Sequence, residues 1–317
     1  MKNKIAIASA LIAASSFSFA EIDLTETFSV KGFINTVYSD NSGSTDLDQF
    51  DNVINDNDAE FNVDEIEISF LFDFGSVSGQ VDTQYGVFNA DQQGTFTNTS
   101  VDQAFIDYDV FGGTLRAGYF DSKLGYEAFE AVDRVTGSTA YNNSQLPGTD
   151  SGLRFTKQLD EVSSIDVAIL DRGSFLGDEG VDLNANEADT VIEVAYGRDL
   201  GNGFNAFVGF RSAANGDDLI NAYVTYETGA MTFAAEIVDG ETEADLQFLA
   251  NYAYSDTASV TVRYTTEEGA GNADDLDQIA IAHQIALADS LMLTTELNDN
   301  GADDNEYEFG VSLLFRF

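Results

Sequence analysis

The sequence predicts an all-β fold, a transmembrane antiparallel up-and-down β-barrel of about 16 strands. Three observations predict it. Short segments alternate between apolar and polar residues along most of the chain, the connections between them alternate between short and long, and the last alternating segment ends at Phe317. Successive side chains of a strand point to opposite faces, so this alternation gives each strand one apolar and one polar face. Short turns at one end and longer loops at the other are typical of barrels that span a membrane.

Residues 1–20 are predicted to be a cleaved signal peptide that takes no part in the fold. Two lysines open the segment, residues 5–14 form an apolar core, and Ser18 and Ala20 occupy the −3 and −1 positions of a small-residue cleavage site. The core is too short to cross a bilayer as a helix, which needs roughly 20 apolar residues. We therefore expect residues 21–317 to form a single exported barrel domain.

The segment 76–88 illustrates how each strand is predicted. Val77 and Val81 lie on one face, and Ser78 and Asp82 lie on the other. The same pattern predicts strands near residues 27–39, 60–72, 76–88, 101–110, 113–120, 151–158, 162–170, 189–199, 203–212, 217–227, 230–239, 244–255, 257–266, 276–287, 290–298 and 305–317. Tight turns are expected at 73–75, 111–112, 159–161, 200–202, 228–229, 256 and 288–289, and the longer connections at 40–59, 89–100, 121–150, 171–188, 213–216, 240–243, 267–275 and 299–304.

Aromatic residues recur on the outward faces at the short-turn ends of these strands. Amphipathic rings are favoured at a membrane–water boundary, so we expect a girdle at this level. Tyr and Phe would form it without Trp, which the chain lacks. Its predicted members are Phe28, Phe72, Tyr108, Tyr196, Phe204, Tyr226, Phe233, Tyr254, Phe315 and Phe317.

The last strand is expected to close the barrel by pairing with the first, because every backbone polar group in lipid needs a partner. Its outward face ends in the aromatic residue Phe317, which resembles the assembly signal of outer-membrane proteins and implies recognition by the barrel-assembly machinery. The residues of this predicted signal are Tyr307, Phe309, Phe315 and Phe317. The strand at 276–287 is the least regular, because its outward set would include His283. A bulge or a subunit contact would accommodate that side chain.

Composition excludes several classes of function. Thirteen Lys and Arg against 56 Asp and Glu give a net charge of −43, which argues against binding nucleic acid or anionic lipid through a basic surface. The acidity fits either solubility in a salty habitat or a pore that favours cations. There are no cysteines, and the single histidine, His283, has no Ser-containing motif near it in sequence. We therefore expect neither an enzyme nor a cofactor.

The alternation of side chains between the two faces of each strand, called strand parity below, points four arginines inward: Arg116, Arg154, Arg211 and Arg263. Arginine on the lipid face at mid-depth costs a few kcal/mol, which favours placement in the lumen. Parity also sends a larger set of carboxylates inward, which leaves the wall net negative and predicts a preference for cations. These wall acids are Glu67, Asp82, Asp107, Asp109, Asp166, Glu193, Glu236, Glu296 and Glu308.

The third long connection, 121–150, is the candidate constriction. A short helix is expected within YEAFEAVDRV, and Glu127, Glu130 and Asp133 would form the acidic side of an eyelet. Arg116 and Arg154 would oppose this loop and create a transverse field. Two simpler alternatives remain open: the loop is solvated and lies over the barrel mouth, or the arginines pair with wall carboxylates.

The segment GTLRAGYFDSKLGYEAFEAVDR, residues 113–134, resembles the Gram-negative porin superfamily, and Leu-Gly-Tyr-Glu at 124–127 is similar to the OmpL-like β-barrel porins. The resemblance covers the whole mature chain at the level of architecture. It implies an outer-membrane channel for passive diffusion of ions and small hydrophilic solutes, commonly a homotrimer, with the third loop folded into the barrel. The loop departs from the enterobacterial pattern, because it lacks a Pro-Glu-Phe-Gly-Gly turn.

Two alternatives to a diffusion channel remain. One is a substrate-specific outer-membrane channel, and the other is a structural or adhesive barrel without an open pore. Acidic clusters at 51–60 and 301–306 offer the hard oxygen ligands that Ca²⁺ prefers, but they match no complete calcium-loop motif and also fit solvated loops.

Overall fold

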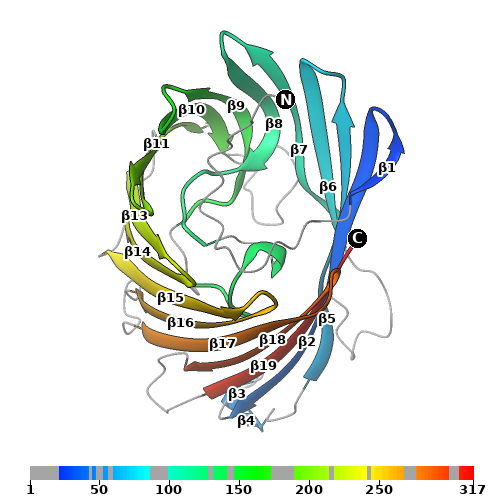
Figure 1. Cartoon of the computed structure of the whole chain (residues 1–317), viewed down its shortest axis with the longest axis vertical. Coiled ribbons are helices and arrows are strands. Elements are labelled where there is room, and N and C mark those ends of the chain that lie inside the picture. The colour runs from blue at the N-terminus through cyan, green and yellow to red at the C-terminus, as the bar shows by residue number, and fades with distance from the viewer. Residues whose placement is uncertain are drawn as a thin grey trace.

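The computed structural model describes residues 21–42, 45–47, 53–55, 60–85, 99–127, 131–140, 146–172, 189–213, 218–240, 244–267, 276–299 and 307–317. Its main sheet has 17 strands; β1 (Ile22–Thr25) lies outside the ring, and the other 16 close into an antiparallel barrel (Figure 1). The barrel strands are β2 (Phe28–Ser42), β5 (Glu60–Asp73), β6 (Val77–Tyr85), β7 (Thr99–Val110), β8 (Gly113–Asp121), β9 (Thr149–Gln158), β10 (Ser163–Arg172), β11 (Asp189–Gly201), β12 (Phe204–Ala213), β13 (Leu219–Thr228), β14 (Met231–Asp239), β15 (Asp245–Ser255), β16 (Ala258–Glu267), β17 (Leu276–Ala288), β18 (Leu291–Asp299) and β19 (Tyr307–Arg316).

The 16 predicted strands are confirmed, because each coincides with one strand of the barrel to within a few residues. Three short strands were not predicted. β1 pairs with residues 28–30 of β2, and β3 (Thr45–Leu47) and β4 (Val53–Asn55) form a hairpin within a segment expected to be a loop. Strands of three or four residues are too short to show an alternating pattern. The predicted signal peptide lies outside the described residues.

The barrel closes between the first and last barrel strands, as predicted. Arg316 pairs with Phe33, and Gly32 and Phe317 exchange two backbone hydrogen bonds of 2.7 and 2.9 Å. A Cβ on Gly32 would lie 2.5 Å from the carbonyl oxygen of Glu67 and 2.8 Å from the ring of Phe317. Glycine at position 32 therefore lets the terminal ring lie flat against the seam.

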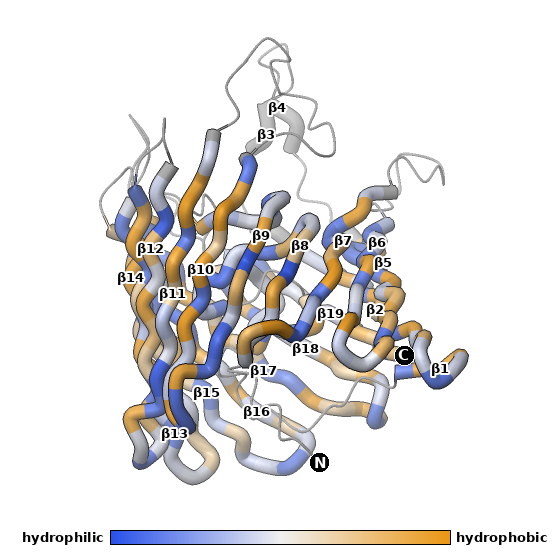
Figure 2. Tube along the Cα trace, turned by 90° about the horizontal axis from the view of Figure 1, so that it is seen from above, coloured by the Kyte–Doolittle hydropathy of each residue, from blue (hydrophilic) through white to orange (hydrophobic). Residues whose placement is uncertain are grey.

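The outward faces carry the apolar residues, and the hydropathy alternates along each strand (Figure 2). At the short-turn end, the rings of Phe204 and Tyr226 stack at a centroid distance of 4.2 Å, and those of Tyr226 and Phe233 at 6.4 Å. Phe28 and Phe72 stack at 5.0 Å. Neighbouring strands thus bring predicted girdle residues into contact at one level of the barrel.

His283 lies on the outward face of β17 at this same level. Its Nε2 and the hydroxyl oxygen of Tyr254 are 2.6 Å apart, and the two rings stack with centroids 5.9 Å apart. No bulge separates His283 from its neighbours Val260 and Thr295. The imidazole is therefore accommodated by a girdle tyrosine, where the membrane meets water, rather than by an irregular strand.

The short turns are tight and use backbone conformations that favour glycine. In the turn between β11 and β12, Asn202 has φ 56° and is followed by Gly203 at 86°. In the turn between β7 and β8, Phe111 has φ 54° and is followed by Gly112 at 73°. Two successive positive φ values fit the right-handed twist of a hairpin, which is why Asn-Gly is common there. Among the described residues, no helix is long and apolar enough to cross a membrane.

Candidate functional site

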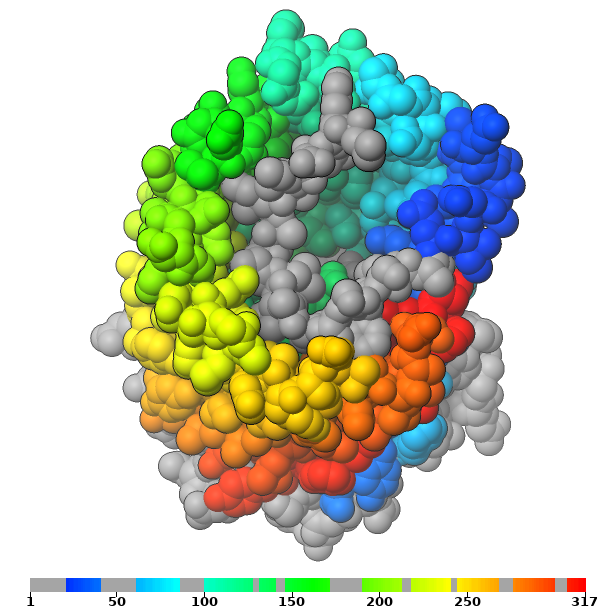
Figure 3. All heavy atoms as spheres, in the orientation of Figure 1, coloured from blue at the N-terminus to red at the C-terminus, as the bar shows by residue number. Residues whose placement is uncertain are grey.

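The third long loop connects β8 and β9, and its described residues lie within the ring of strands, which surrounds a hollow when viewed along its axis (Figures 1 and 3). The loop contains one short 3-10 helix, η2 (Ala131–Asp133). The described loop residues 122–127 and 131–140 contact inward-facing side chains of β5, β11, β14 and β18. These contacts define the geometry of the lumen.

Wall carboxylates accept hydrogen bonds from the loop backbone. Glu236 and Glu296 were expected to line open water, but each instead holds a segment of the loop. The hydrogen bonds, in loop order, are Ser122 Oγ (2.6 Å) and Lys123 N (3.1 Å) to Glu193, Tyr126 N (2.8 Å) to Glu236, Ala131 N (3.3 Å) to Glu65, and Gly137 N (2.6 Å) and Ser138 N (2.9 Å) to Glu296. Hydrogen bonds to ionised acceptors are roughly twice as strong as neutral ones, so this row of carboxylates fixes the path of the loop.

Arg263 on β16 joins the middle of the loop to the wall. Its side chain is 1% exposed and its Nη1 lies 3.0 Å from Oε2 of Glu127. The guanidinium also donates to Thr136 Oγ1 at 2.8 Å, to both oxygens of Ser138, and to the carbonyl of Thr139 at 2.6 Å. Glu127, predicted to be a free acid of the eyelet, is therefore neutralised by a buried arginine.

Arg154 and Arg211 hold the two ends of the same loop. Arg154 donates to the carbonyl of Asp121 at 2.8 Å and to Glu193 at 2.7 Å. Arg211 donates to Asp150 at 2.5 Å and also reaches Glu193 at 3.4 Å. The predicted transverse field is corrected here for Arg154: this residue lies at the base of the loop and does not face it across the lumen. Pairing with carboxylates, the simpler alternative, describes both arginines.

Arg116 is the most accessible of the four inward arginines, with 26% of its side chain exposed. It forms a bidentate ion pair with Asp107, with both N–O distances at 2.9 Å. Its guanidinium carbon lies 3.5 Å from the centre of the Phe105 ring. Arg116 pairs directly with Arg154 across β8 and β9, and the centre of the Phe120 ring lies 5.9 and 4.7 Å from their guanidinium carbons.

Apolar side chains of the loop pack against apolar residues of the inner wall. Leu124 and Ala140 form one cluster with Leu219 and Val238, next to Gly209. A second cluster contains Tyr126, Val135, Tyr223, Ala234 and Leu249. A third cluster contains Val132, Phe33, Met292 and Leu314. Sequence analysis missed these inward apolar residues, although the runs Leu219-Ile220 and Ile237-Val238, apolar on both faces, were a signal for them.

Of the expected helix within residues 126–135, the structure describes only residues 126–127 and 131–135. The described part contains one 3-10 turn, η2, and not a longer helix. Burial raises the pKa of Asp133, although Arg316 and Lys31 lie near enough to oppose the shift. Glu130 lies outside the described residues.

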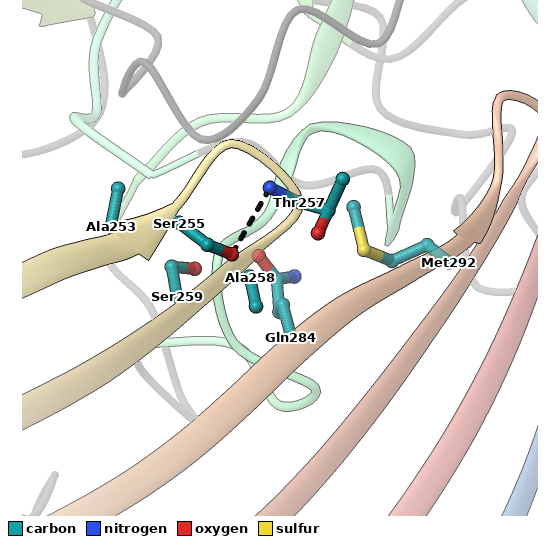
Figure 4. A pocket seen from close by; sticks show the side chains of 7 residues that line it. All are labelled: Ala253, Ser255, Thr257, Ala258, Ser259, Gln284 and Met292. Atoms are coloured by element: carbon teal, nitrogen blue, oxygen red, sulfur yellow. Dashed lines mark hydrogen bonds between the residues drawn. The ribbon is translucent and has the colours of Figure 1, made fainter.

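Beneath the loop, a small pocket lies between the turn joining β15 and β16 and the strands β17 and β18 (Figure 4). Ser255 Oγ accepts a hydrogen bond from Thr257 N at 3.3 Å, and Gln284 donates to the carbonyl of Arg134 at 3.2 Å. Its volume of about 10 Å³ leaves room for roughly one water molecule. The pocket is a packing defect beside a loop anchor and offers no room for a solute.

A second set of inward carboxylates lies on β5, β6 and β7. Glu67, Asp82 and Asp102 form no ion pair with any described Lys or Arg; Glu67 accepts from Ser69 and Asp82 accepts from Gln80. Asp102 interacts electrostatically with Asp121, Asp82 and Glu65. This group, Glu67, Asp82 and Asp102, is called the acidic wall below.

Two β-bulges add carboxylates to this part of the barrel. The register shifts between Asn35 and Thr36 opposite Asp64, and between Asp82 and Thr83 opposite Asp102. A bulge places one extra residue on its strand and re-aims the side chain. Neither Asp64 nor Asp102 was a predicted site residue, because regular alternation assigns no bulges.

Comparison with known proteins identifies the architecture. The family model described as "Putative beta-barrel porin-2, OmpL-like" matches residues 27–273. The chain belongs to this porin family. OmpF of Salmonella typhi, solved in complex with daunomycin, is similar with a TM-score of 0.72 and 12% identity, over 94% of this chain and 100% of that one. Two mutants of Rhodopseudomonas blastica porin are similar at TM-scores of 0.65 and 0.62, with 13% and 15% identity, over 92% of this chain and 100% of theirs. No curated protein matches the chain in a sequence comparison.

The remaining predicted wall acids of the porin lie toward the rims of the lumen. Asp109 accepts a hydrogen bond from Thr114 at 3.1 Å, and Asp166 accepts one from Thr156 at 2.5 Å. Glu308 interacts electrostatically with Glu296. Together with the ion pair of Asp107, these contacts place all nine predicted wall acids on the inner face.

The residues of the predicted assembly signal lie at the end of the porin chain. Tyr307, Phe309 and Phe315 are exposed on the outward face of β19, and Phe317 packs on the seam. Most of the acidic clusters at 51–60 and 301–306 lies outside the described residues. Within the part of the porin that is described, no group of three or more His, Cys, Asp or Glu side chains is arranged to hold a metal ion.

Proposed function

We propose that this porin is an outer-membrane channel for passive diffusion of ions and small hydrophilic solutes, and that it prefers cations. One observation supports the preference most directly. The buried arginines of the lumen are neutralised by Glu127, Asp150 and Glu193, while the acidic wall forms no ion pair among the described residues, although Lys31 and Arg116 interact electrostatically with Asp82. Charge that is not compensated within the wall remains available to the ions in the lumen.

The electrostatics of a pore are set by the charges that face its water. A buried ion pair has little net charge and projects little field. The inner surface therefore presents the partly exposed Asp102 to permeating ions, with the buried carboxylates Glu67 and Asp82 beside it. This arrangement attracts K⁺ and repels Cl⁻. The OmpL-like family and the barrel of 16 strands support the open channel itself.

We also propose that the porin works as a homotrimer in the lipid of the outer membrane and is inserted there by the barrel-assembly machinery. The aromatic end of β19, with Phe317 at the seam, supports this route of assembly.

Removal of charge from the acidic wall tests the proposal. In planar bilayers with asymmetric KCl, the reversal potential of the wild-type channel should show K⁺ crossing more readily than Cl⁻. The variant carrying Asp82→Asn and Asp102→Asn should lower the permeability ratio by about twofold or more, because the charge of the partly exposed Asp102 and that of the buried Asp82 beside it are both lost. Asp239→Asn, which removes an outward carboxylate, is the matched control and should leave the ratio unchanged. A wild-type preference for Cl⁻ contradicts the cation proposal, and a purified barrel with no conductance contradicts the channel.

A further inference from the structure

Positive charge on the outer face of the barrel is confined to one place. Of the strand Lys and Arg side chains that the structure describes, Lys157 on β9 and Arg198 on β11 are the ones that follow the outward parity. Outward carboxylates occur instead at the long-loop ends of their strands: Asp171, Asp239, Asp277 and Asp299. The described outer face therefore carries positive charge toward the short turns and negative charge toward the long loops, in a chain with a net charge of −43.

The two cations lie close together at the short-turn end. Lys157 pairs with Ile165 on β10, and Ile165 pairs with Tyr196 on β11, so the three residues form one transverse row. Neighbouring strands are 4.7–4.9 Å apart, which separates the backbones of Lys157 and Tyr196 by about 10 Å. Arg198 follows on the same face as Tyr196, and its Nη1 donates to the tyrosine hydroxyl at 3.2 Å. Long Lys and Arg side chains can reach a common ligand across this distance.

The neighbouring carboxylates bond mainly to their own turns, although Asp160 also interacts electrostatically with Arg198. Asp160 Oδ1 accepts two hydrogen bonds from the turn that follows it, at 2.7 and 3.0 Å, and Asp199 Oδ1 accepts one from Gly201 N at 2.7 Å. Within the described chain, neither Lys157 nor Arg198 forms an ion pair. Both cations therefore remain available to an anion from outside the barrel.

Apolar side chains lie on both sides of the cations along the barrel axis. Leu159 and Leu200 continue the same outward faces toward the short turns and are 52% and 54% exposed. Toward the middle of the span, Leu153 and Ile192 are also exposed on these faces. Cations between exposed apolar side chains match the boundary of a membrane, where a charged head group sits next to hydrocarbon. A free anion in water would gain nothing from these leucines.

We propose that Lys157, Tyr196 and Arg198 bind the phosphate of an anionic phospholipid head group at the short-turn side of the membrane. The ammonium and guanidinium groups donate to the phosphate oxygens, and the acyl chains lie along the apolar outer face of β9 to β11. The net charge argues against a basic lipid-binding surface for the molecule as a whole. The local clustering of two cations that form no ion pair within the described chain overrides that argument at this position.

Lipid binding by the full-length mature porin tests the site. Native mass spectrometry would compare phosphatidylglycerol with phosphatidylcholine at equal concentration. The wild type should retain phosphatidylglycerol preferentially, and Lys157→Gln and Arg198→Gln should each weaken that binding about fivefold, as expected for one basic residue at an anionic membrane surface. Lys157→Arg should retain it. Lys31→Gln removes the same charge from the inner face and is the matched control.

Three results would overturn the proposal. The first is equal retention of the two lipids by the wild type, or an unchanged preference for phosphatidylglycerol in the double variant that carries both Lys157→Gln and Arg198→Gln. The second is displacement of phosphatidylglycerol by excess inorganic phosphate, which would assign the residues to a free anion. The third is dissociation of the oligomer in the double variant without added lipid, which would make this face a contact between subunits. None of these results depends on the ion preference of the channel.

Discussion

A side chain at position 209 would collide with the third loop. Gly209 faces the lumen from β12, and a Cβ there would overlap Cδ2 of Leu124, which lies in the apolar cluster with Leu219 and Val238. Gly310 on β19 is also an inward strand glycine, but a Cβ there would meet nothing within 4 Å. The contrast assigns Gly209 a specific role, because its missing methyl group makes space for the loop.

Gly209→Val should displace the loop from the wall. Overpacking of this kind typically costs about 1–3 kcal/mol. We expect a less heat-stable barrel and a larger, noisier single-channel current in planar bilayers, because the constriction is no longer held in place. Gly310→Val is the control and should leave the current close to that of the wild type. Equal currents in both variants would show that Leu124 does not need this space.

The orientation of the charged residues was predictable, but their partners were not. Parity is a local property, so the inward direction of Arg263 followed from its own strand. Its partner Glu127 is 136 residues away, and nothing in either segment identifies the other. Because both side chains are buried, loss of either one would leave the other charged and unpaired, at a cost of about 3–5 kcal/mol. The acidic eyelet was predicted from the types of residue in the loop, and these types do not show that Glu127 pairs with Arg263.

At the scale of the element, the loop is attached to the barrel wall at many points. Backbone N–H groups that would otherwise lack partners are satisfied by wall carboxylates, and apolar side chains fill the spaces between. An unmade hydrogen bond to a buried group costs about 1–3 kcal/mol, so each attachment opposes the release of its own segment of the loop. The described part of the loop is thus a fixed part of the wall rather than a hinged flap.

Glu296→Ala should release one part of the loop. Glu296 accepts backbone hydrogen bonds from Gly137 and Ser138, at 2.6 and 2.9 Å, and the variant leaves both donors without an acceptor. We expect a loss of about 2–4 kcal/mol in unfolding free energy and frequent current fluctuations. Unfolding in guanidinium chloride and single-channel recording would measure the two effects. Glu308→Ala, on the adjacent strand, removes the same charge without freeing the loop; similar behaviour of the two variants would contradict the assignment.

The position and pairing of strands was predictable at this scale, and their irregularities were not. Alternation repeats every two residues and loop parity requires only the order of strands, so 16 strands were found from the sequence. A bulge such as that at Asp102 depends on its partner strand as well as its own. Inward apolar residues such as Tyr223 pack against Tyr126 of the loop, and their contact depends on the path of a segment without regular structure.

At the scale of the whole molecule, the seam between β2 and β19 completes the ring. The last residue takes part through its main chain and its ring, since Phe317 exchanges two backbone hydrogen bonds with Gly32 and packs against it. The edge of β2 beyond this point pairs with β1. The described strands along the seam are therefore paired and present no open sheet edge to the hydrocarbon, where unpaired backbone groups would be costly.

Deletion of Phe317 should weaken the closure. Two backbone hydrogen bonds and a ring contact are lost at the seam, for an expected loss of about 2–4 kcal/mol. The folded form should disappear at a lower temperature on a detergent gel, and the yield of inserted barrel should fall. Phe315→Ala removes an outward ring while leaving the seam intact, and it should have the smaller effect on melting. A deletion variant that melts like the wild type would contradict this role.

The described part of the loop is held by inward carboxylates of β5, β11, β14 and β18, so it narrows the water path between these strands. We expect a permeating ion to follow a crescent of water between the loop and the inner face of β6 and β7, where Asp102 is partly exposed. Side chains such as Glu236 and Arg263, although inward, stay behind the loop and never meet a solute. Substitutions that change the charge of Glu236 or Arg263 should alter how stably the loop is held. Substitutions that change charge on β5 to β7 should instead alter which ions enter the channel.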